Sequence, residues 1–267
     1  PKGSTPEGLD EKQKMKLIAA NWKMNKTVEE SIFLVRELKK LIGNESYNEI
    51  VVCPPFTALH AVSKELKGSS IKLGAQNMYF RDSGAYTGEI SALMLKEIGV
   101  KYVILGHSER RETFGEKNSL INEKIHAALH NGLFPILCVG EGLEDRNRGK
   151  AKEIIEGQLG DCLKGVKADE MKKISIAYEP LWAISKGNPN HKPATAKDAE
   201  EMHRSIKNFL SKIFDSGTAK NIRIIYGGSM KPDNAKEFMS MQNIDGGLVG
   251  NASLYAKSFA DVVKAAR

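Results

Sequence analysis

Short apolar runs alternate with amphipathic stretches along the chain. Each run is too short to form a helix by itself, so the runs are interpreted as strands and the stretches between them as helices. The pattern predicts eight strands: Leu17–Ala20, Ile50–Cys53, Ile71–Ala75, Tyr102–Leu105, Pro135–Val139, Ile174–Tyr178, Ile222–Tyr226 and Gly247–Val249.

The stretches between these runs carry the start signals of helices. Thr27 followed by Glu30 is a capping box, in which each side chain satisfies a backbone N–H of the first helical turn. Thr195 with Asp198 is a weaker version of the same signal, and the helix after it is expected to end near Phe214. Its apolar face is expected to consist of Met202, Ile206, Phe209, Leu210 and Ile213.

This order of elements predicts a single α/β domain. Strands that alternate with helices form parallel sheets, and eight strand–helix units of roughly 30 residues favour a closed (β/α)8 TIM barrel over residues 15–267. The alternative is a doubly wound sheet. That fold usually has a G-x-G-x-x-G turn after its first strand, whereas residues 19–23 read Ala-Ala-Asn-Trp-Lys. Residues 1–14 are polar and lack the apolar core of a secretion signal, so we expect a flexible extension or tag there.

Composition and charge narrow the classes of partner. Of the 267 residues, 41% are hydrophobic and 27% are charged, which is ordinary for a globular protein. The net charge of +7 comes without a dense basic run, so we expect a solvated surface or an attraction for small anions and no nucleic-acid binding. The longest nearly apolar run, Leu133–Val139, is too short to span a membrane. Cys53, Cys138 and Cys162 lack metal-ligand spacing, which predicts reduced thiols and a cytoplasmic location.

Side chains with useful chemistry follow several of the predicted strands. In a (β/α)8 barrel the active site lies at the C-terminal ends of the strands. Glu179 follows the sixth strand, where a carboxylate can act as a general base. His107 follows the fourth strand and precedes a helix start, which disfavours a protonated imidazole but leaves a neutral donor for a carbonyl. Asn21 and Lys23 follow the first strand. The alternatives are surface positions for Glu179 and Lys23 and a buried, backbone-bonded histidine at position 107.

Small residues follow the last two strands. Gly227, Gly228 and Ser229 come after the seventh strand, and residues 250–253 come after the eighth. In barrels these loops commonly hold a phosphate through backbone N–H groups, although both could equally be ordinary turns. A base, a neutral electrophile, a cation and a phosphate cradle fit proton abstraction next to a carbonyl of a small phosphorylated substrate. We expect no metal and no cofactor.

Several segments, in this order, resemble the triosephosphate isomerase family. They extend from about residue 15 to the C-terminus and are highly specific in combination. The segments are Ala20–Asn25, Gly74–Asn77, Thr87–Ser91, Gly106–Arg111, Cys138–Glu141, Ala177–Ile184, Tyr226–Ser229 and Asp245–Gly250. The resemblance implies a cofactor-independent enzyme that interconverts dihydroxyacetone phosphate and D-glyceraldehyde 3-phosphate in glycolysis and gluconeogenesis.

The resemblance also implies roles for individual residues. Glu179 would be the base that moves the proton, with His107 as the neutral electrophile. Lys23 would be the electrostatic partner, and Asn21 a hydrogen-bonding neighbour. The implied substrate-binding residues are Ser185, Gly187, Ser229, Leu248, Gly250 and Asn251.

Supporting residues and a partner subunit are implied in the same way. Ser108 and Glu109 would hold the site together. Family members are usually homodimers, in which the loop around residues 76–89 reaches the partner and Thr87 supports the partner's site. The aromatic residues of this loop independently favour a dimer, because an exposed aromatic loop is unusual on a monomer. The alternative is a loop folded onto its own barrel.

Two loops depart from the family pattern. The lid after the sixth strand has Ser185 in place of a glycine, and residues 188–191 lengthen it. We expect Ser185 to keep a negative φ and the extra residues to bulge into solvent; the alternative is a lid too long to close. Asn251 occupies the place of a second glycine and keeps its backbone N–H. Two other functions stay open: a barrel that binds phosphate without turnover, and another phosphosugar enzyme on this fold.

Overall fold

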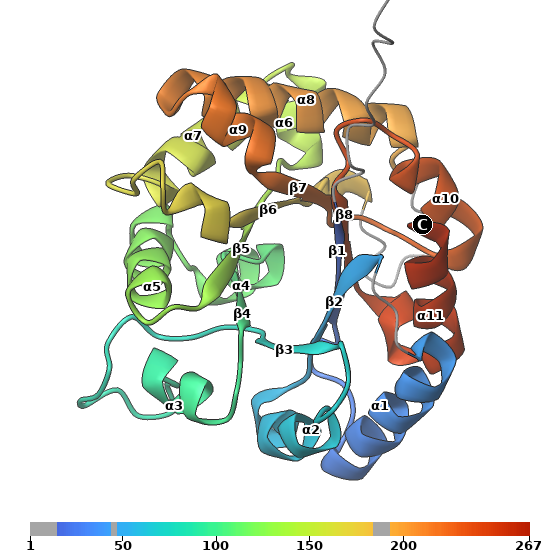
Figure 1. Cartoon of the computed structure of the whole chain (residues 1–267). Helices are drawn as coiled ribbons and strands as arrows, with labels where there is room; N and C mark the ends of the chain where they lie inside the picture. The colour runs from blue at the N-terminus through green and yellow to red at the C-terminus, as the bar shows by residue number, and fades with distance from the viewer. Residues whose placement is uncertain (1–14, 44–46, 184–192) are drawn as a thin grey trace, which may run out of the picture.

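Eight parallel strands form a closed ring in which β8 returns to pair with β1 (Figure 1). The structure is a computed structural model, and it describes residues 15–43, 47–183 and 193–267. The strands are β1 Lys16–Asn21, β2 Asn48–Cys53, β3 Lys72–Ala75, β4 Tyr102–Leu105, β5 Phe134–Val139, β6 Ser175–Tyr178, β7 Arg223–Tyr226 and β8 Gly246–Val249. The predicted barrel is therefore confirmed, and each predicted strand begins and ends within two residues of the observed one. The predicted extension at residues 1–14 lies outside the described residues.

Helices connect the strands and surround the barrel (Figure 1). They are α1 Val28–Ile42, α2 Leu59–Glu65, α3 Ala92–Glu97, α4 Ser108–Phe114, α5 Asn118–His130, α6 Leu143–Asn147, α7 Ala151–Cys162, α8 Ala196–Ile213, α9 Ser216–Asn221, α10 Pro232–Met239 and α11 Ala256–Ala265. Both predicted capping boxes are formed. The Glu30 carboxylate accepts from Thr27 N at 2.7 Å, and Asp198 accepts from Thr195 N at 2.9 Å. Helices α1 and α8 therefore begin where the sequence predicts.

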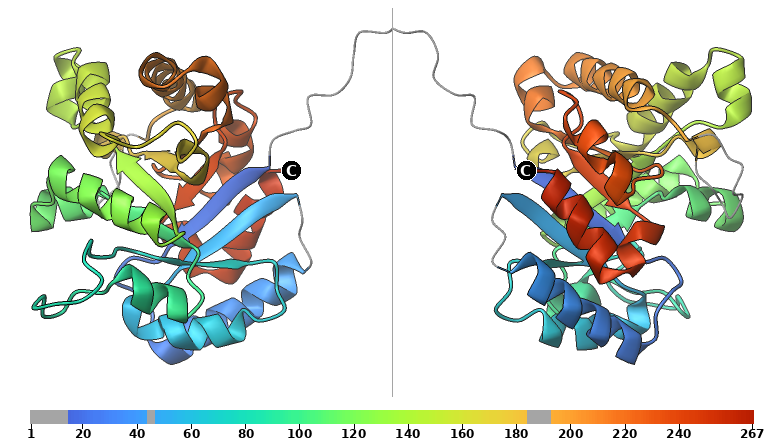
Figure 2. Two further views of the ribbon diagram at one scale, coloured as in Figure 1. Left: turned by 60° about the vertical axis from the view of Figure 1, so that its left-hand side comes forward. Right: turned by 90° about the vertical axis from the view of Figure 1, so that its right-hand side faces the viewer.

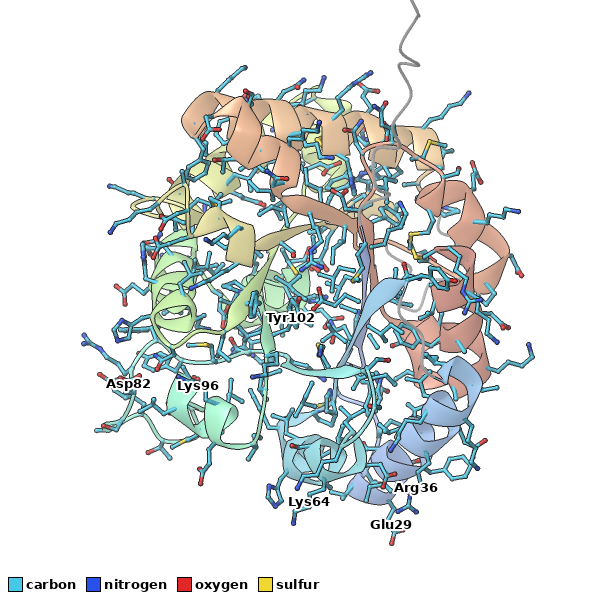
Figure 3. All side chains as sticks on the ribbon, viewed as in Figure 1. Glu29, Arg36, Lys64, Asp82, Lys96 and Tyr102 are labelled. Atoms are coloured by element: carbon cyan, nitrogen blue, oxygen red, sulfur yellow. The ribbon has the colours of Figure 1, made fainter. Side chains whose placement is uncertain are left out.

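Alternation along each strand divides the core in two. Successive side chains of a strand point to opposite faces of the sheet. In β1, Leu17 and Ala19 belong to a cluster inside the barrel, whereas Ile18 and Ala20 belong to the larger cluster that also contains the helices' apolar faces. Side chains from β2 and from β4 to β8 complete the barrel interior, among them Tyr102, which Figure 3 shows near the centre of the ring. Because the interior is packed, a substrate can bind only at an end of the barrel.

A long excursion leaves the barrel between β3 and α3 and projects from its body (Figure 2). Residues 81–89 are exposed, and Figure 3 shows Asp82 at the periphery of the molecule. The rings of Tyr79 and Tyr86 lie 4.7 Å apart between centroids, and those of Tyr79 and Phe80 lie 4.5 Å apart. The excursion is thus held together by its own aromatic side chains while its outer part contacts solvent.

The expected apolar face of α8 packs against the core except at its last residue. Met202, Ile206 and Leu210 are buried, and Phe209 packs against the same core. Ile213 keeps 42% of its surface exposed, because sequence periodicity gives the direction of a side chain and not what lies opposite it. Among the described residues, no helix is both long and apolar enough to cross a membrane.

Candidate active site

Three side chains that follow different strands become buried at one end of the barrel. Asn21 ends β1, His107 follows β4 and Glu179 follows β6, and they are 5%, 6% and 2% exposed. These positions are the C-terminal ends of parallel strands, so the ring of strands brings together residues that are far apart in the sequence (Figure 1). A buried polar side chain needs hydrogen-bond partners, so the partners of these three residues determine how each side chain is held.

Glu179 and His107 form a direct pair. His107 Nε2 lies 2.9 Å from Glu179 Oε1, and Ser108 N donates to Glu179 Oε2 at 2.9 Å. Both carboxylate oxygens therefore accept a hydrogen bond from consecutive residues at the start of α4. A carboxylate satisfied in this way stays ionised although it is buried.

The other ring nitrogen of His107 indicates its tautomer. Glu109 N donates to His107 Nδ1 at 3.2 Å, so Nδ1 must present a lone pair. Nε2 then carries the ring proton and donates it to Glu179. This hydrogen-bond network corresponds to the Nε2–H tautomer of a neutral imidazole.

The charges of the pair move both pKa values. Burial by itself raises the pKa of Glu179, but His107, the Ser108 N–H and Lys23 outweigh it, and the net pKa lies below the ordinary value. Burial lowers the pKa of His107, whereas the Glu179 carboxylate raises it, and the net pKa lies above the ordinary value. The raised pKa of His107 thus depends on contact with Glu179, and it opposes the effect of the helix start.

Lys23 has an uncommon backbone conformation. Its φ is 54°, in the left-handed region that non-glycine residues rarely adopt. Lys23 N donates to the Asn21 side-chain oxygen at 3.1 Å, and Gln76 Nε2 donates to Lys23 O at 2.8 Å. The side chain then reaches Glu109, with Lys23 Nζ 2.6 Å from Oε1. Surrounding hydrogen bonds therefore impose a conformation that turns this lysine toward the site.

A glycine leaves room for the Glu179 side chain. A Cβ added to Gly227 would lie 2.8 Å from Glu179 Cγ, closer than real Cβ contacts. The sequence predicts a phosphate cradle at residues 227–229. The structure adds a second reason for a small residue here, because the turn after β7 passes directly beside the carboxylate.

The remaining predicted binding residues lie around the same end. Ser229 is half-buried after β7, and Leu248 is part of the cluster inside the barrel. Gly250 lies beside Lys23, since a Cβ added to it would be 3.7 Å from Lys23 Cε, and Asn251 is exposed next to it. The predicted lid residues Ser185 and Gly187, and the extra residues 188–191, lie outside the described residues.

The segment that leads into the predicted lid is anchored by a buried carboxylate. Glu141 Oε1 accepts from Tyr178 Oη at 3.0 Å and from Trp182 Nε1 at 2.8 Å. Arg146 stacks on Trp182 with its guanidinium carbon 4.0 Å from the ring centroid, and it donates to Asp198 at 2.7 Å. Burial raises the pKa of Glu141, and these donors only partly lower it.

Some contributors were not assigned roles from sequence. Gln76 bonds to both Lys23 O and Cys53 O, at 2.8 and 2.9 Å, and so joins the ends of β1 and β2. Its position directly after β3 was the available signal.

Thr87 lies on the exposed part of the excursion, and within the described residues it forms no hydrogen bond to the site. In residues 15–43, 47–183 and 193–267 no group of three or more His, Cys, Asp or Glu side chains is placed to hold a metal.

Comparison with known proteins decides the family. The family model described as triosephosphate isomerase matches residues 16–266. The chain belongs to the triosephosphate isomerase family. It is 52% identical over 247 residues to the triosephosphate isomerase of Carboxydothermus hydrogenoformans, covering 92% of this chain and 97% of that one. It is 49% identical over 249 residues to the enzyme of Dictyoglomus thermophilum, covering 93% and 98% of the two chains. The Aquifex aeolicus triosephosphate isomerase is 50% identical over 248 residues, with 93% and 98% covered.

Membership of the triosephosphate isomerase family agrees with the segments on which the resemblance rested. Seven of the eight lie at the end of a strand in the structure and lead out of it: those beginning at Ala20, Gly74, Gly106, Cys138, Ala177, Tyr226 and Asp245. The eighth, Thr87–Ser91, lies on the excursion before α3. The matched region also includes the residues of β8 and the turn after it.

Proposed function

We propose that this protein interconverts dihydroxyacetone phosphate and D-glyceraldehyde 3-phosphate through an enediolate, as a step of glycolysis and gluconeogenesis. The observation that supports it most is the buried Glu179 carboxylate, which contacts His107 Nε2 at 2.9 Å next to Lys23. A carboxylate, a neutral imidazole and an ammonium group are the set that proton abstraction beside a carbonyl requires. Assigning Glu179 as base and His107 as neutral electrophile follows the established mechanism of triosephosphate isomerases.

The proton movements follow from these positions. Glu179 takes a proton from C1 of dihydroxyacetone phosphate, the C–H electron pair forms the C1–C2 double bond, and O2 becomes an oxyanion. Lys23 and the Nε2–H of His107 stabilise that oxyanion. His107 then moves the hydroxyl proton from O1 to O2, and protonated Glu179 returns its proton to C2, which gives the aldehyde. The sequence starts and ends with an ionised Glu179 and a neutral His107.

Substrate must displace Glu179 from His107 before the imidazole can bind a carbonyl. The carboxylate occupies Nε2 in the structure at 2.9 Å. When it moves to the substrate carbon, His107 loses the main effect that raises its pKa, whereas burial still lowers it. The same displacement therefore frees the base and favours the neutral form of the electrophile.

The phosphate is proposed to bind at the turns after β7 and β8, the second of which lies beside Lys23. Ser229, Gly250 and Asn251 offer backbone N–H groups there, and Leu248 lies beneath them in the barrel interior. Ser185 and Gly187 are proposed to complete the site from the lid. The triose phosphate is an anion, which suits the net charge of +7.

A coupled assay with each triose phosphate tests this function. The expected result is turnover in both directions without added metal or cofactor, with solvent deuterium incorporated at the carbon that Glu179 protonates. Binding of the phosphates without turnover would instead indicate a barrel that has lost its catalysis. Turnover of a different phosphosugar only would indicate another enzyme of this fold.

We also infer that two copies of the chain form a homodimer through the excursion after β3. Its base is rigid, because the buried Lys124 donates to Asn77 at 3.0 Å and to Glu116 at 2.6 Å. Its outer part, residues 81–89, is exposed and includes Tyr86, which keeps 39% of its surface accessible. A rigid loop with an exposed aromatic tip is suited to insertion into a partner, where Thr87 would support the partner's site.

Light scattering at micromolar concentration tests the dimer, and the mass of two chains is expected. Thr87→Ala should lower kcat while the mass stays that of a dimer, whereas Ser83→Ala on the same exposed stretch should change neither. A monomeric mass for the active protein would contradict this proposal.

Three free and buried cysteines suit a reducing compartment, so we propose a cytoplasmic location.

A further inference from the structure

Arg111 on α4 makes hydrogen bonds that join several parts of the chain. Arg111 Nε donates to Gly106 O at 2.6 Å, and one terminal nitrogen donates to Cys138 O at 3.1 Å. The other terminal nitrogen donates to Asn118 Oδ1 at 2.6 Å. A guanidinium is a planar fork whose donors have fixed directions, so these bonds together define where the backbone carbonyls lie.

The two carbonyls lie just beyond the last residues that β4 and β5 pair with each other. The ladder between β4 and β5 ends with Leu105 opposite Leu137. Gly106 and Cys138 are the next residues, and Arg111 bonds to the carbonyl of each. The guanidinium therefore connects the two strands where sheet hydrogen bonding between them has stopped.

The peptide that Arg111 holds comes directly before His107. Gly106 has a φ of +70°, and a Cβ there would lie 2.9 Å from the Arg111 guanidinium and 3.3 Å from Cys138 O. Glycine permits this conformation but does not enforce it, because it can adopt many others. The hydrogen bond from Arg111 Nε to Gly106 O supplies the missing restraint on the direction in which the chain enters His107.

Arg111 also lies on the helix that His107 caps. Its own N–H donates to His107 O at 3.1 Å, one turn back along α4. The first N–H groups of α4 bond to the reacting pair: Ser108 N to Glu179, and Glu109 N to His107 Nδ1. Gly106, His107, α4 and Arg111 thus form a closed unit that sets both the ring's tautomer and the carboxylate's direction.

We propose that Arg111 is a positioning residue for His107 and Glu179, a role that rests on the proposed function of that pair. Its side-chain hydrogen bonds in the described residues go to neither of these side chains, so it acts through the Gly106 peptide and the start of α4. Misplacement of a reacting group by about 1 Å can lower the rate roughly 10²-fold. Loss of Arg111 should therefore reduce kcat strongly and KM little, because the phosphate-binding turns after β7 and β8 are unchanged.

A pocket beside Arg111 makes chemical rescue feasible. It has a volume of about 330 Å³ and is lined by Arg111, Ser108, Gln158 and Glu179, with the exposed Glu112 on its outer side. In the Arg111→Ala variant this pocket would gain the space of the lost side chain. Free guanidinium can then enter and bond to the same two carbonyls, which a simple ammonium ion cannot bridge in the same geometry.

The experiment compares Arg111→Ala with Arg36→Ala. The Arg36 side chain lies on α1 with 61% exposure and forms an ion pair with Glu65. We expect Arg111→Ala to lose about 10²-fold in kcat with KM within about threefold. Guanidinium chloride at tens of millimolar should restore at least tenfold, whereas equal concentrations of methylammonium or sodium chloride should not. Arg36→Ala should match the wild type in all conditions.

A second measurement separates positioning from folding. The ¹⁵N chemical shifts of the His107 ring report which nitrogen carries the proton, and in Arg111→Ala the Nε2–H form should lose its dominance. If Arg111→Ala fails to fold, two milder variants replace it. Arg111→Lys can reach only one carbonyl at a time, and Asn118→Ala removes one anchor of the guanidinium. Each should then show a smaller loss of kcat and a measurable shift of the ring signals.

Normal kcat and ring signals in the folded variants would overturn the proposal, whatever their thermal stability. A loss of kcat without guanidinium rescue and without a change in the ring signals would also overturn it. If the wild type itself shows no turnover, the proposed function fails instead, and the ring signals of the variants still decide whether Arg111 positions His107.

Discussion

Charged side chains gather at both ends of this barrel, but they are held in different ways. At the end where the strands begin, Arg223 pairs with Glu49 at 2.5 Å and donates to Tyr102 at 3.0 Å. In the same region Lys16 Nζ donates to Ile244 O at 2.8 Å, and His203 Nδ1 lies 3.1 Å from Asn243 O. These side chains start or support strands, and their partners are parts of the sheet or of the segment entering β8.

At the end where the strands finish, the charged groups face one another instead. Glu179, His107, Lys23 and Glu109 form one connected set, and Lys23 is kept in a left-handed conformation. An anionic substrate with a carbonyl group can replace the contacts that Glu179 and Lys23 make in the structure. The difference indicates that charges at the first end stabilise the barrel, whereas those at the second end are available for chemistry.

The largest expected effect is that of Glu179→Gln. It removes the base but keeps the size and hydrogen-bonding reach of the side chain, so kcat should fall by about 10²- to 10⁴-fold. Glu49→Gln is the same change at the other end, and it should leave kcat within about twofold. Steady-state kinetics of both variants checks the contrast. Near wild-type turnover in Glu179→Gln would refute its role as base.

Lys23→Ala should have the next largest effect. The substrate loses its cation, so both capture of the phosphate and stabilisation of the oxyanion suffer, and kcat/KM should fall by about 10²-fold. Lys16→Ala, at the opposite end of the same strand, should keep kcat/KM. Circular dichroism should show both variants folded. Equal kinetic losses in the two would remove the distinction between the ends.

Arg223→Met should change stability and not activity. It leaves Glu49 without its ion pair and Tyr102 without a donor in a mostly buried setting, and we expect a loss of about 2 to 3 kcal/mol in the free energy of unfolding. Urea unfolding measures it, with the Glu49→Gln variant used to complete a double-mutant cycle. A large loss of kcat in folded Arg223→Met would show that this end also serves catalysis.

His203 predicts a smaller, pH-dependent effect at the same end. Burial lowers its pKa to about 4, from an ordinary value of 6.5. Between these values His203 binds a proton in the unfolded chain but not in the folded chain. The stability that the neutral His203 contributes is therefore fully present above about pH 6.5 and is lost as the pH falls from about 6.5 to about 4. The loss between pH 7 and pH 5 should be roughly 2 kcal/mol. His203→Asn, which keeps a donor for Asn243 O, should remove most of this pH dependence in urea unfolding, even if it is less stable at pH 7.

The strands could be predicted from sequence because burial constrains local sequence directly. A strand with both faces covered must be a short apolar run, and its two faces alternate within it, as Leu17 and Ile18 do in β1. The candidate site followed from one further rule, that chemistry lies after the strands, which is how Asn21, His107 and Glu179 were selected. Both kinds of inference use information that lies within a few neighbouring residues.

The features that were missed depend on contacts between distant residues. The conformation of Lys23 is imposed by Gln76, which lies 53 positions away, and no local signal at Lys23 announces it. Arg111 reads as an ordinary helix residue until the structure places Cys138 O beside its guanidinium. Ile213 is the opposite case. The helical periodicity places it correctly on the apolar face, but no neighbouring residue covers it fully.

The pairing of β8 with β1 has a consequence for how each new chain matures. Leu17 pairs with Gly246 and Ala20 with Val249, so the first and last strands meet only after nearly the whole polypeptide has been synthesised. Contacts this distant in sequence form slowly and late. Gly250 reaches Lys23 through the same closure, so a partly synthesised chain cannot assemble the site. On a ribosome, the first turnover of substrate should therefore appear abruptly, with the release of β8, rather than grow in proportion to the length of chain already folded.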